Sequence, residues 1–507
     1  MLEAAATAFA SIVVLGTGFG LGGFLYHKFY KWLVLYKMER AFKPGDPVLE
    51  LAAIGKQVPN TIASNQGHDE RDHWIQRDEQ AKIDAIVNGT DRGHYHLLIG
   101  EKGTGKSSML LDAMYKINGE GVSMFEAHAD IEIFRIRLGK SLDFEFHEDY
   151  IGSYFSERGP RDTTALLDIE RAFNKLEKVA LKRRRTVGRP LILIINCVHL
   201  LRDDEDGQDL LELLQQRAEQ WAAANLVTMV FNSDDYWVYE RLKKLATRME
   251  VTSITDLPRD QAISALTKYR QKYFRETPNS EILSEVYDRV GGRLTFLNRV
   301  AKSPDMLKTC NSIIDVERRW FLNQCWILGE GMDDDVMDQQ KYAVRPILPS
   351  PVYPSTPNHV ITQSAAMVLA KALVEAEHSQ PLSSTDGSHN IPQIPLHIAR
   401  QIMTRADFIK SYDHINLFTI TSTAHVRADS VPMQRAFRSI CSEPGFPSHL
   451  EKTLQRIADI ESLGRTREIV AKDLVAGGRY KIVLRDGERR GEKVTEVVLE
   501  EKGDEDD

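Results

Sequence analysis

Short runs of apolar residues alternate in this chain with longer segments in which apolar residues recur every three or four positions. Near-continuous apolar runs are typical of parallel strands buried on both faces, whereas the wider spacing is that of helices. The alternation predicts an α/β domain with a parallel sheet over residues 74–255. The predicted strands are 97–99, 122–127, 191–195, 226–231 and 251–254.

A second pattern follows this domain. Asp256, with Pro258 close behind it, is a helix start signal, and residues 256–342 are predicted to form a separate helical lid. Five prolines between positions 346 and 357 then mark an extended linker over 343–359.

The C-terminal part has the element order of a winged helix. Apolar periodicity predicts a helix over 360–376, and two short helices follow at 395–403 and 406–412. Residues 417–427 alternate as a hairpin. This order predicts an α+β winged-helix domain over 360–485.

The end of the chain carries a further hairpin signal. The dipeptide Asp486-Gly487 lies between two apolar-rich segments, 480–484 and 494–499. The part 486–507 is therefore predicted to contain the hairpin end and an acidic tail, which is expected to be disordered.

The N-terminal segment predicts a membrane anchor over residues 1–40. About 23 residues from Ala4 to Tyr26 contain no Asp, Glu, Lys or Arg, which is long enough to cross a bilayer. Lysines and arginines follow this stretch and only Glu3 precedes it, so the positive-inside rule places the rest of the chain on the cytosolic or matrix face. A mitochondrial membrane is compatible with this segment, although it is not an Arg-rich presequence. The alternative is a buried core helix.

Between the anchor and the α/β domain lies a polar linker, residues 41–73. A helix then opens near Trp74. Arg77 in this helix is a candidate ligand contact; the alternative is that Arg77 and its neighbours form a solvated face.

Composition and cysteine spacing bear on the kinds of partner, metal site and disulfide that the chain can have. The chain has 507 residues, of which 42% are hydrophobic and 27% charged, and its net charge is −8. That balance does not indicate nucleic acid as the overall partner. The four cysteines form no C-x-x-C pair, so neither a zinc site of that type nor a disulfide framework is predicted.

The chemistry is concentrated after the first predicted strand, where Gly100-x-x-x-x-Gly105-Lys106-Ser107 fits the phosphate-loop pattern in full. Glycines let the backbone approach a polyphosphate, and backbone N–H groups at the following helix N-terminus face its oxygens. Lys106 is predicted to contact the β- and γ-phosphates of ATP, and Ser107 to bind Mg²⁺. The predicted binding residues are Gly100, Glu101, Lys102, Gly103, Thr104, Gly105, Lys106, Ser107 and Ser108.

The order of parts over residues 74–303 resembles the AAA+ ATPases, in particular the origin-recognition and clamp-loader-like branch. The C-terminal part resembles the winged-helix domain of a group of fungal AAA proteins. The resemblance implies that Asn232 is the first sensor, that Arg293 is a second sensor contacting the γ-phosphate, and that Arg248 is an arginine finger. A finger acting on a neighbouring subunit implies self-association. Both arginines have an alternative as surface or salt-bridged residues.

The resemblance also implies a departure. At the end of the strand 191–195, where such ATPases carry a metal-orienting carboxylate and a catalytic acid, this chain has Asn196 and Cys197. An amide carries no charge and a thiol is a poor base, so binding is predicted more firmly than hydrolysis. Glu126, at the end of a neighbouring strand, is a candidate relocated base; the alternative is a surface carboxylate.

Three functions follow as hypotheses. The first is a membrane-anchored ATPase that couples ATP–Mg²⁺ binding to contacts with a protein partner. The second is a nucleotide-gated scaffold without turnover, which the residues at 196 and 197 favour. The third is a nucleic-acid-binding ATPase that uses the winged helix, whose basic residues are sparse: Arg400, Arg405, Lys410 and Arg427.

Overall fold

The computed structural model describes residues 2–45, 49, 75, 77–146, 164–325, 363–379, 391–403, 406–455, 479–485 and 492–498. The chain divides into two compact units, which are described separately. The first comprises residues 1–321 and 369–439, and the second residues 322–368 and 440–507. The predicted linkers 41–73 and 343–359, the residues 333–342 and the acidic tail lie almost wholly outside the described residues.

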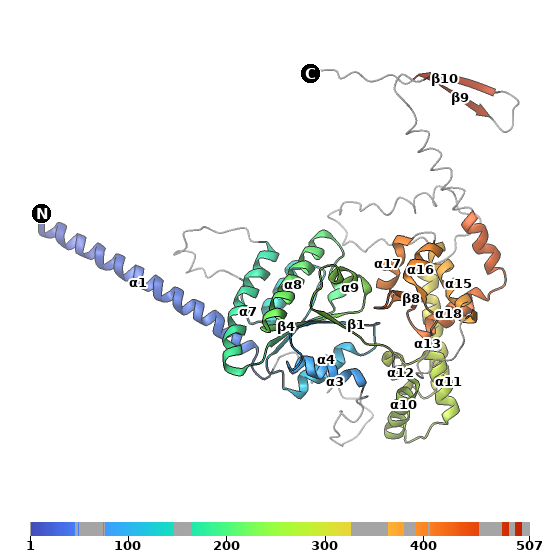
Figure 1. The fold of residues 1–507 in the computed structure, drawn as a ribbon, viewed down its shortest axis with the longest axis horizontal. Coiled ribbons are helices and arrows are strands. Elements are labelled where there is room, and N and C mark those ends of the chain that lie inside the picture. Colours follow the sequence, from blue (N-terminus) through green and yellow to red (C-terminus); the bar gives the residue numbers. More distant parts are fainter. Residues whose placement is uncertain are drawn as a thin grey trace. The chain divides into compact units, whose positions relative to one another are not determined.

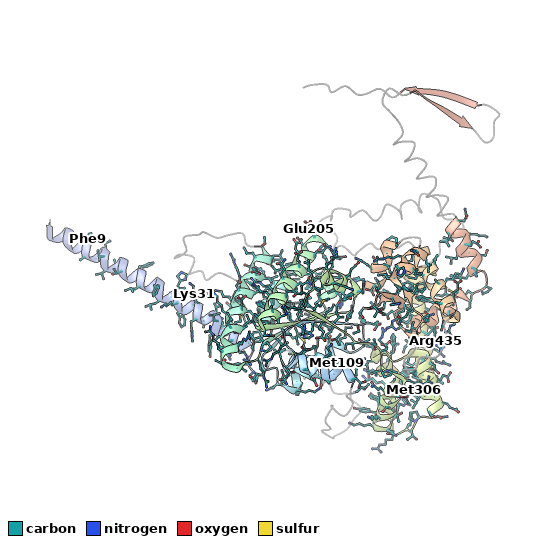
Figure 2. The ribbon with its side chains drawn as sticks, viewed as in Figure 1. Phe9, Lys31, Met109, Glu205, Met306 and Arg435 are labelled. Carbon is teal, nitrogen blue, oxygen red and sulfur yellow. The ribbon has the colours of Figure 1, made fainter. Side chains whose placement is uncertain are left out.

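The N-terminal helix α1 (Leu2–Ala41) is 40 residues long. Its stretch from Phe9 to Ala41 is long and apolar enough to cross a membrane, and only 6% of its most apolar window is buried. Figure 2 shows the side chains of this helix, with Phe9 and Lys31 labelled. Apolar side chains are exposed along it, so this part of the helix is not buried in a core formed by the described residues. The end of α1 contacts α7 (Ala165–Val187), where Met38 is fully buried.

A five-stranded parallel sheet forms the centre of the first unit, with strand order β2-β3-β4-β1-β5. Every residue of β3 and β4 is buried, as their continuous apolar sequences predicted. The parallel α/β prediction is therefore confirmed (Figure 1). The strands are β1 (Tyr95–Ile99), β2 (Val122–Glu126), β3 (Leu191–Asn196), β4 (Val227–Ser233) and β5 (Met249–Ser253).

Helices cover both faces of the sheet, because successive strand residues point to opposite sides. Leu98 of β1 packs with α3 (Asp78–Val87) and α4 (Lys106–Lys116), whereas its neighbour Leu97 belongs to the core on the other face. That second core is closed by α5 (Ile131–Ser141), α7, α8 (Glu205–Ala224) and α9 (Tyr236–Lys243).

The helical lid follows β5 as predicted. Its core is formed by apolar residues of four helices, and Leu257 N–H donates to Gly292 C=O at its base. The helices are α10 (Arg259–Tyr273), α11 (Ser280–Val290), α12 (Leu294–Ala301) and α13 (Met306–Gln324).

The winged-helix elements also form. A three-stranded antiparallel sheet has the order β6-β8-β7, so the predicted hairpin over 417–427 is confirmed. The elements are α15 (Gln363–Ser379), β6 (Ile394–Pro395), α16 (Leu396–Ile402), η3 (Ala406–Phe408), α17 (Ile409–His414), β7 (Phe418–Ile420), β8 (His425–Ala428) and α18 (Val431–Cys441). In the second unit, β9 (Arg479–Arg485) and β10 (Glu492–Val498) pair antiparallel, and the predicted turn at Asp486-Gly487 lies outside the described residues.

Candidate functional site

The phosphate loop connects β1 to α4. Gly103 and Gly105 have φ values of 85° and 100°, a left-handed conformation that favours glycine. At Gly100 a Cβ would lie 2.1 Å from the carbonyl oxygen of Ile254, so no side chain fits there. The loop thus has the backbone that a triphosphate cradle requires, with the N-terminus of α4 directly behind it.

Lys106 is buried, and its ammonium group has three partners. Its Nζ donates to the carbonyl oxygens of Gly100 and Glu101 at 2.7 and 2.9 Å, and it lies 2.8 Å from Asp234 Oδ1. Asp234 follows β4, and the sequence analysis assigned it no role. The same carboxylate lies beside His199, whose pKa burial lowers. An anionic side chain therefore already contacts the lysine that would bind phosphate.

The structure brings together three predicted residues, one from the first turn of α4 and one each from the carboxyl ends of β3 and β4. Ser107 Oγ donates to Asn196 Oδ1 at 3.0 Å, and Asn232 Nδ2 donates to Ser107 Oγ at 3.1 Å. Asn232 also donates to Asn196 Oδ1. In the sheet, β4 lies between β3 and β1, and all three strands run in the same direction, so their carboxyl ends lie at one edge and residues far apart in sequence meet there. This cluster offers only neutral oxygens to a cation.

Cys197 and Glu126 lie at the same edge of the sheet. Cys197 adopts a left-handed conformation after β3, and burial raises the pKa of its thiol to about 11, with Asp234 and Glu126 adding to the effect. Because the thiol stays protonated near neutral pH, it is unsuited to accepting a proton from water. Glu126 is exposed and pairs in register with Asn196, which places it at the end of the neighbouring strand as expected.

Arg293 joins the phosphate loop, the lid and the winged helix. Its side chain is only 2% exposed. Its Nε donates to Asp256 Oδ1 at 2.8 Å, and its Nη1 donates to Asp429 Oδ2 at 2.9 Å and to the carbonyl oxygen of Lys102 at 3.2 Å. The salt-bridged alternative that the sequence left open for this arginine therefore describes its contacts here.

A second buried pair crosses the same contact. Arg427 of β8 donates to the carboxylate of Glu101 in the phosphate loop. Burial opposes the charge of Glu101, but Arg427 and Arg293 more than offset it, so the pKa of this carboxyl is lowered. The sequence predicted Glu101 as a nucleotide-binding residue and Arg427 as one of the few basic residues through which the winged helix could contact nucleic acid. Their pairing depends on a separation of 326 positions that no local pattern encodes.

Two further contacts brace the loop. Arg77 is 5% exposed and donates to the carbonyl oxygens of Thr104 and Thr255 at 2.8 and 2.5 Å. The hypothesis that Arg77 belongs to a solvated face is therefore wrong. The first residues of the lid helix α12 also lie against the loop, because a Cβ on Gly105 would approach Leu294 Cδ1 to 2.7 Å.

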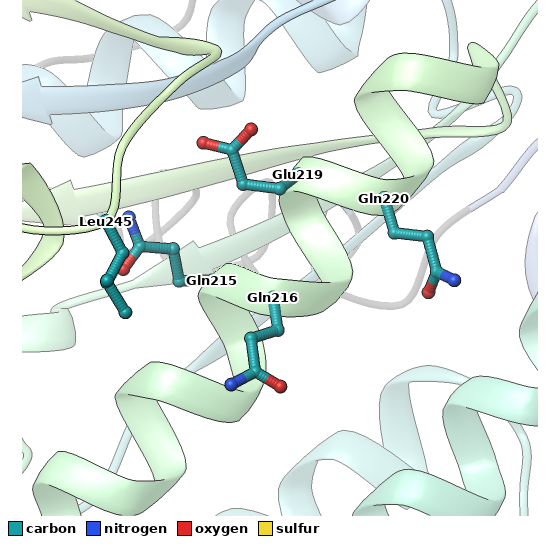
Figure 3. Close-up of a pocket in the computed structure, with 5 residues that line it drawn as sticks. All are labelled: Gln215, Gln216, Glu219, Gln220 and Leu245. Atoms are coloured by element: carbon teal, nitrogen blue, oxygen red, sulfur yellow. The ribbon is translucent and has the colours of Figure 1, made fainter.

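Arg248 lies apart from this cluster. It is exposed and immediately precedes β5, whose first residue pairs with Tyr95 at the opposite end of β1 from the phosphate loop. Its backbone N–H donates to Glu219 Oε1 at 3.0 Å. Glu219 also lines a shallow polar hollow on α8 with Gln215, Gln216, Gln220 and Leu245 (Figure 3). Within its own chain, Arg248 is therefore not brought to the nucleotide loop.

We expect Glu317→Gln to stabilise the protein at pH 8 by about 1 kcal/mol, and to have no such benefit at pH 4.5. Burial, then Asp429, raise the pKa of Glu317 on α13 from 4.5 to about 7. With the folded pKa above the unfolded one, the stability contribution is complete below pH 4.5 and is lost as pH rises through 7. Chemical denaturation at both pH values measures this. Asp315→Asn, an exposed acid on the same helix, is the control, and equal effects from both variants would contradict the prediction.

Comparison with known proteins agrees with this architecture. Residues 73–229 match the AAA ATPase domain, and residues 356–461 match the C-terminal winged helix domain of fungal AAA proteins. No curated protein matches the chain.

Several solved structures are also similar to this chain. The Walker-type ATPase PABY2304 of Pyrococcus abyssi is 11% identical, with a TM-score of 0.44, covering 74% of this chain and 99% of its own. Cdc6p from Pyrobaculum aerophilum is 12% identical, with a TM-score of 0.31, covering 73% and 97%. The Aeropyrum pernix Orc1 protein in complex with DNA is 13% identical, with a TM-score of 0.33, covering 78% and 97%. Together with the parallel sheet and its phosphate loop, the two family matches show that this chain combines an AAA ATPase domain with a fungal AAA C-terminal winged-helix domain.

Proposed function

We propose that this protein is a membrane-anchored AAA+ ATPase that binds ATP–Mg²⁺ and uses its nucleotide state to control contacts with a protein partner. The observation that carries the proposal is the position of Arg293. One buried guanidinium contacts the nucleotide loop at Lys102, the lid at Asp256 and the winged helix at Asp429. A change at the loop that alters the contacts of this guanidinium would therefore reach both other parts.

The nucleotide loop fits a triphosphate. Its left-handed glycines give the backbone the curvature of a phosphate cradle, and Lys106 supplies the cation. A phosphate group entering here would compete with Asp234 for Lys106, because both are anions seeking the same ammonium group. The γ-phosphate would compete in the same way with Asp256 and Asp429 for Arg293. ATP binding would thus release contacts that hold the winged helix to the loop.

Magnesium would be held by Ser107, with Asn196 accepting a hydrogen bond from a metal-bound water. The bound ion would supply charge neutralisation for the phosphates. Neutral donors are compatible with Mg²⁺ that is carried largely by the nucleotide itself. Asn232 would help to orient an attacking water, and Glu126 would be its base, since the Cys197 thiol stays protonated.

The remaining parts supply location and partners. The exposed apolar surface of α1 supports anchoring in a membrane, with the ATPase on the side of the lysines and arginines that follow the span. Nothing in α1 specifies a mitochondrial membrane. Arg248, exposed and remote from its own loop, is free to act on the nucleotide of a second copy, which supports self-association.

The structure favours one alternative function and disfavours another. A scaffold without turnover is favoured by Asn196 and by the protonated thiol of Cys197. A nucleic-acid-binding ATPase is disfavoured, because Arg427 is 8% exposed and paired with Glu101 rather than available to phosphates of a nucleic acid.

Three measurements on the full chain in detergent micelles test the proposal. We expect calorimetry to detect heat with ATP and Mg²⁺, phosphate to be released slowly, and hydrogen exchange of β7 and β8 to accelerate when ATP is bound. Lys106→Ala should abolish all three. ATP retention without phosphate release would support the scaffold instead. No heat with correctly folded protein would overturn nucleotide binding, and binding that leaves β7 and β8 unchanged would overturn the coupling.

A further inference from the structure

A buried histidine lies at the end of the sheet opposite the nucleotide loop. His96, the second residue of β1, is 0% exposed, and neither of its ring nitrogens has a hydrogen-bond partner among the described residues. Unpartnered polar atoms in a core are costly, so such a residue calls for an explanation. Nothing in the proposed nucleotide chemistry uses it.

Two carboxylates face the two edges of this ring. Asp91, in the turn after α3, places Oδ2 3.9 Å from His96 Nε2. Glu250 pairs with His96 in register across β1 and β5, and places Oε2 3.8 Å from His96 Nδ1. Both separations are too long for hydrogen bonds. One ligand atom from each of the three residues lies within 4.8 Å of the others.

The His96 ring cannot satisfy both of the carboxylates that face it. Burial lowers the pKa of His96 to about 4, although Asp91 and Glu250 oppose the shift and His94 and Lys82 add to it, so the ring is neutral at pH 7. A neutral imidazole has one N–H donor and one lone pair. One carboxylate can face the N–H, but the other then faces the lone pair. A cation between the lone pair and that carboxylate would remove the repulsion.

We propose that Asp91, His96 and Glu250 form a binding site for a divalent transition-metal ion of the zinc type. Neutral imidazole and carboxylate are ligands for such an ion, with bonds of about 2.0 to 2.2 Å. Two ligands of a tetrahedral ion with these bonds lie roughly 3.4 Å apart. The three ligand atoms here lie within 4.8 Å of one another, so one carboxylate would rotate toward the ring nitrogen that the ion uses. His94, whose Nδ1 lies 3.8 Å from Asp91 Oδ1, or water would complete the coordination.

Lys82 would compete with a metal ion for the Glu250 carboxylate. Its Nζ lies 2.7 Å from Glu250 Oε1, while the other oxygen of the same carboxylate faces His96. The ammonium group and the metal ion would therefore share Glu250 and repel each other. A bound ion would join the turn after α3 to β1 and β5, the two strands that lead into Gly100 and Asp256. The site does not depend on nucleotide binding.

The test is a Co²⁺ titration of the full chain in detergent micelles, after removal of metals with a chelator and without nucleotide. We expect one equivalent to produce visible absorption bands of a tetrahedral or five-coordinate ion, and Zn²⁺ to displace it. The absence of a thiolate charge-transfer band would separate this site from the cysteines. His96→Asn and Asp91→Asn should each weaken binding about tenfold or more, and His128→Asn, outside the site, should have no effect.

Lys82→Met provides a readout that a purely structural ion pair would not give. We expect it to tighten Co²⁺ binding, because the competing cation at Glu250 is removed. The proposal is overturned if the wild-type protein gives no stoichiometric signal, or if the signal persists in Asp91→Asn. It is also overturned if Lys82→Met leaves the affinity unchanged or lowers it. Should His96→Asn fail to fold by circular dichroism, the half-buried Asp91 and the Lys82 variant decide the question.

Discussion

Replacing Arg293 by alanine is expected to lower the free energy of unfolding by about 3 to 5 kcal/mol, the cost of leaving buried charges without their partner. Asp256 and Asp429 would both lose the guanidinium that lies between them. Burial already raises the pKa of Asp429, which shows that its charged form is held in an unfavourable environment. Thermal and chemical denaturation of the full chain would measure the effect.

The matched control for this prediction is Arg289→Ala. Arg289 is on the neighbouring lid helix α11 and pairs with Glu285 on the surface, so its loss should cost less than about 1 kcal/mol. Combining Arg293→Met with Asp429→Asn should recover part of the stability, because the uncompensated carboxylate is removed as well. Equal effects of Arg293→Ala and Arg289→Ala would show that the buried cluster does not hold the lid and winged helix to the loop.

Asp234→Asn is expected to tighten ATP binding by about 10- to 100-fold. The charge-assisted contact between Asp234 and Lys106 must break before phosphate can take the ammonium group, and such contacts contribute roughly 1.5 to 3 kcal/mol. Asparagine keeps the shape of the side chain but removes the competing charge. Calorimetric titration of the full chain with ATP and Mg²⁺ would measure the change in affinity.

Asp203→Asn is the control for this second prediction. Asp203 pairs with Arg241 at 3.4 Å, and both side chains are about one third exposed, so its removal should leave ATP affinity within a few-fold. Weaker binding in Asp234→Asn would contradict the prediction, and would mean that Asp234 assists nucleotide binding instead of competing with it.

Local sequence was sufficient for the strands of the parallel sheet and for the nucleotide loop. The apolar runs of β3 and β4 predict buried parallel strands because such strands have no solvent-facing side. The loop at Gly100–Ser107 is recognisable because each residue has a chemical task at a fixed spacing. Convergence of Ser107, Asn196 and Asn232 was also foreseeable, since all three follow or end strands of one parallel sheet.

Tertiary structure alone decided which charges meet. Asp234 and Asp429 carry no local pattern that distinguishes them from surface acids, yet they contact Lys106 and Arg293. The sequence of β1 likewise gave no reason to pair His96 with Glu250, because that requires the register of β5. Periodicity and spacing in the sequence predict which residues share a face of one helix or strand, because the geometry of that element fixes their positions. A buried ion pair depends on how separate elements dock, and that is settled by the packing of the whole domain.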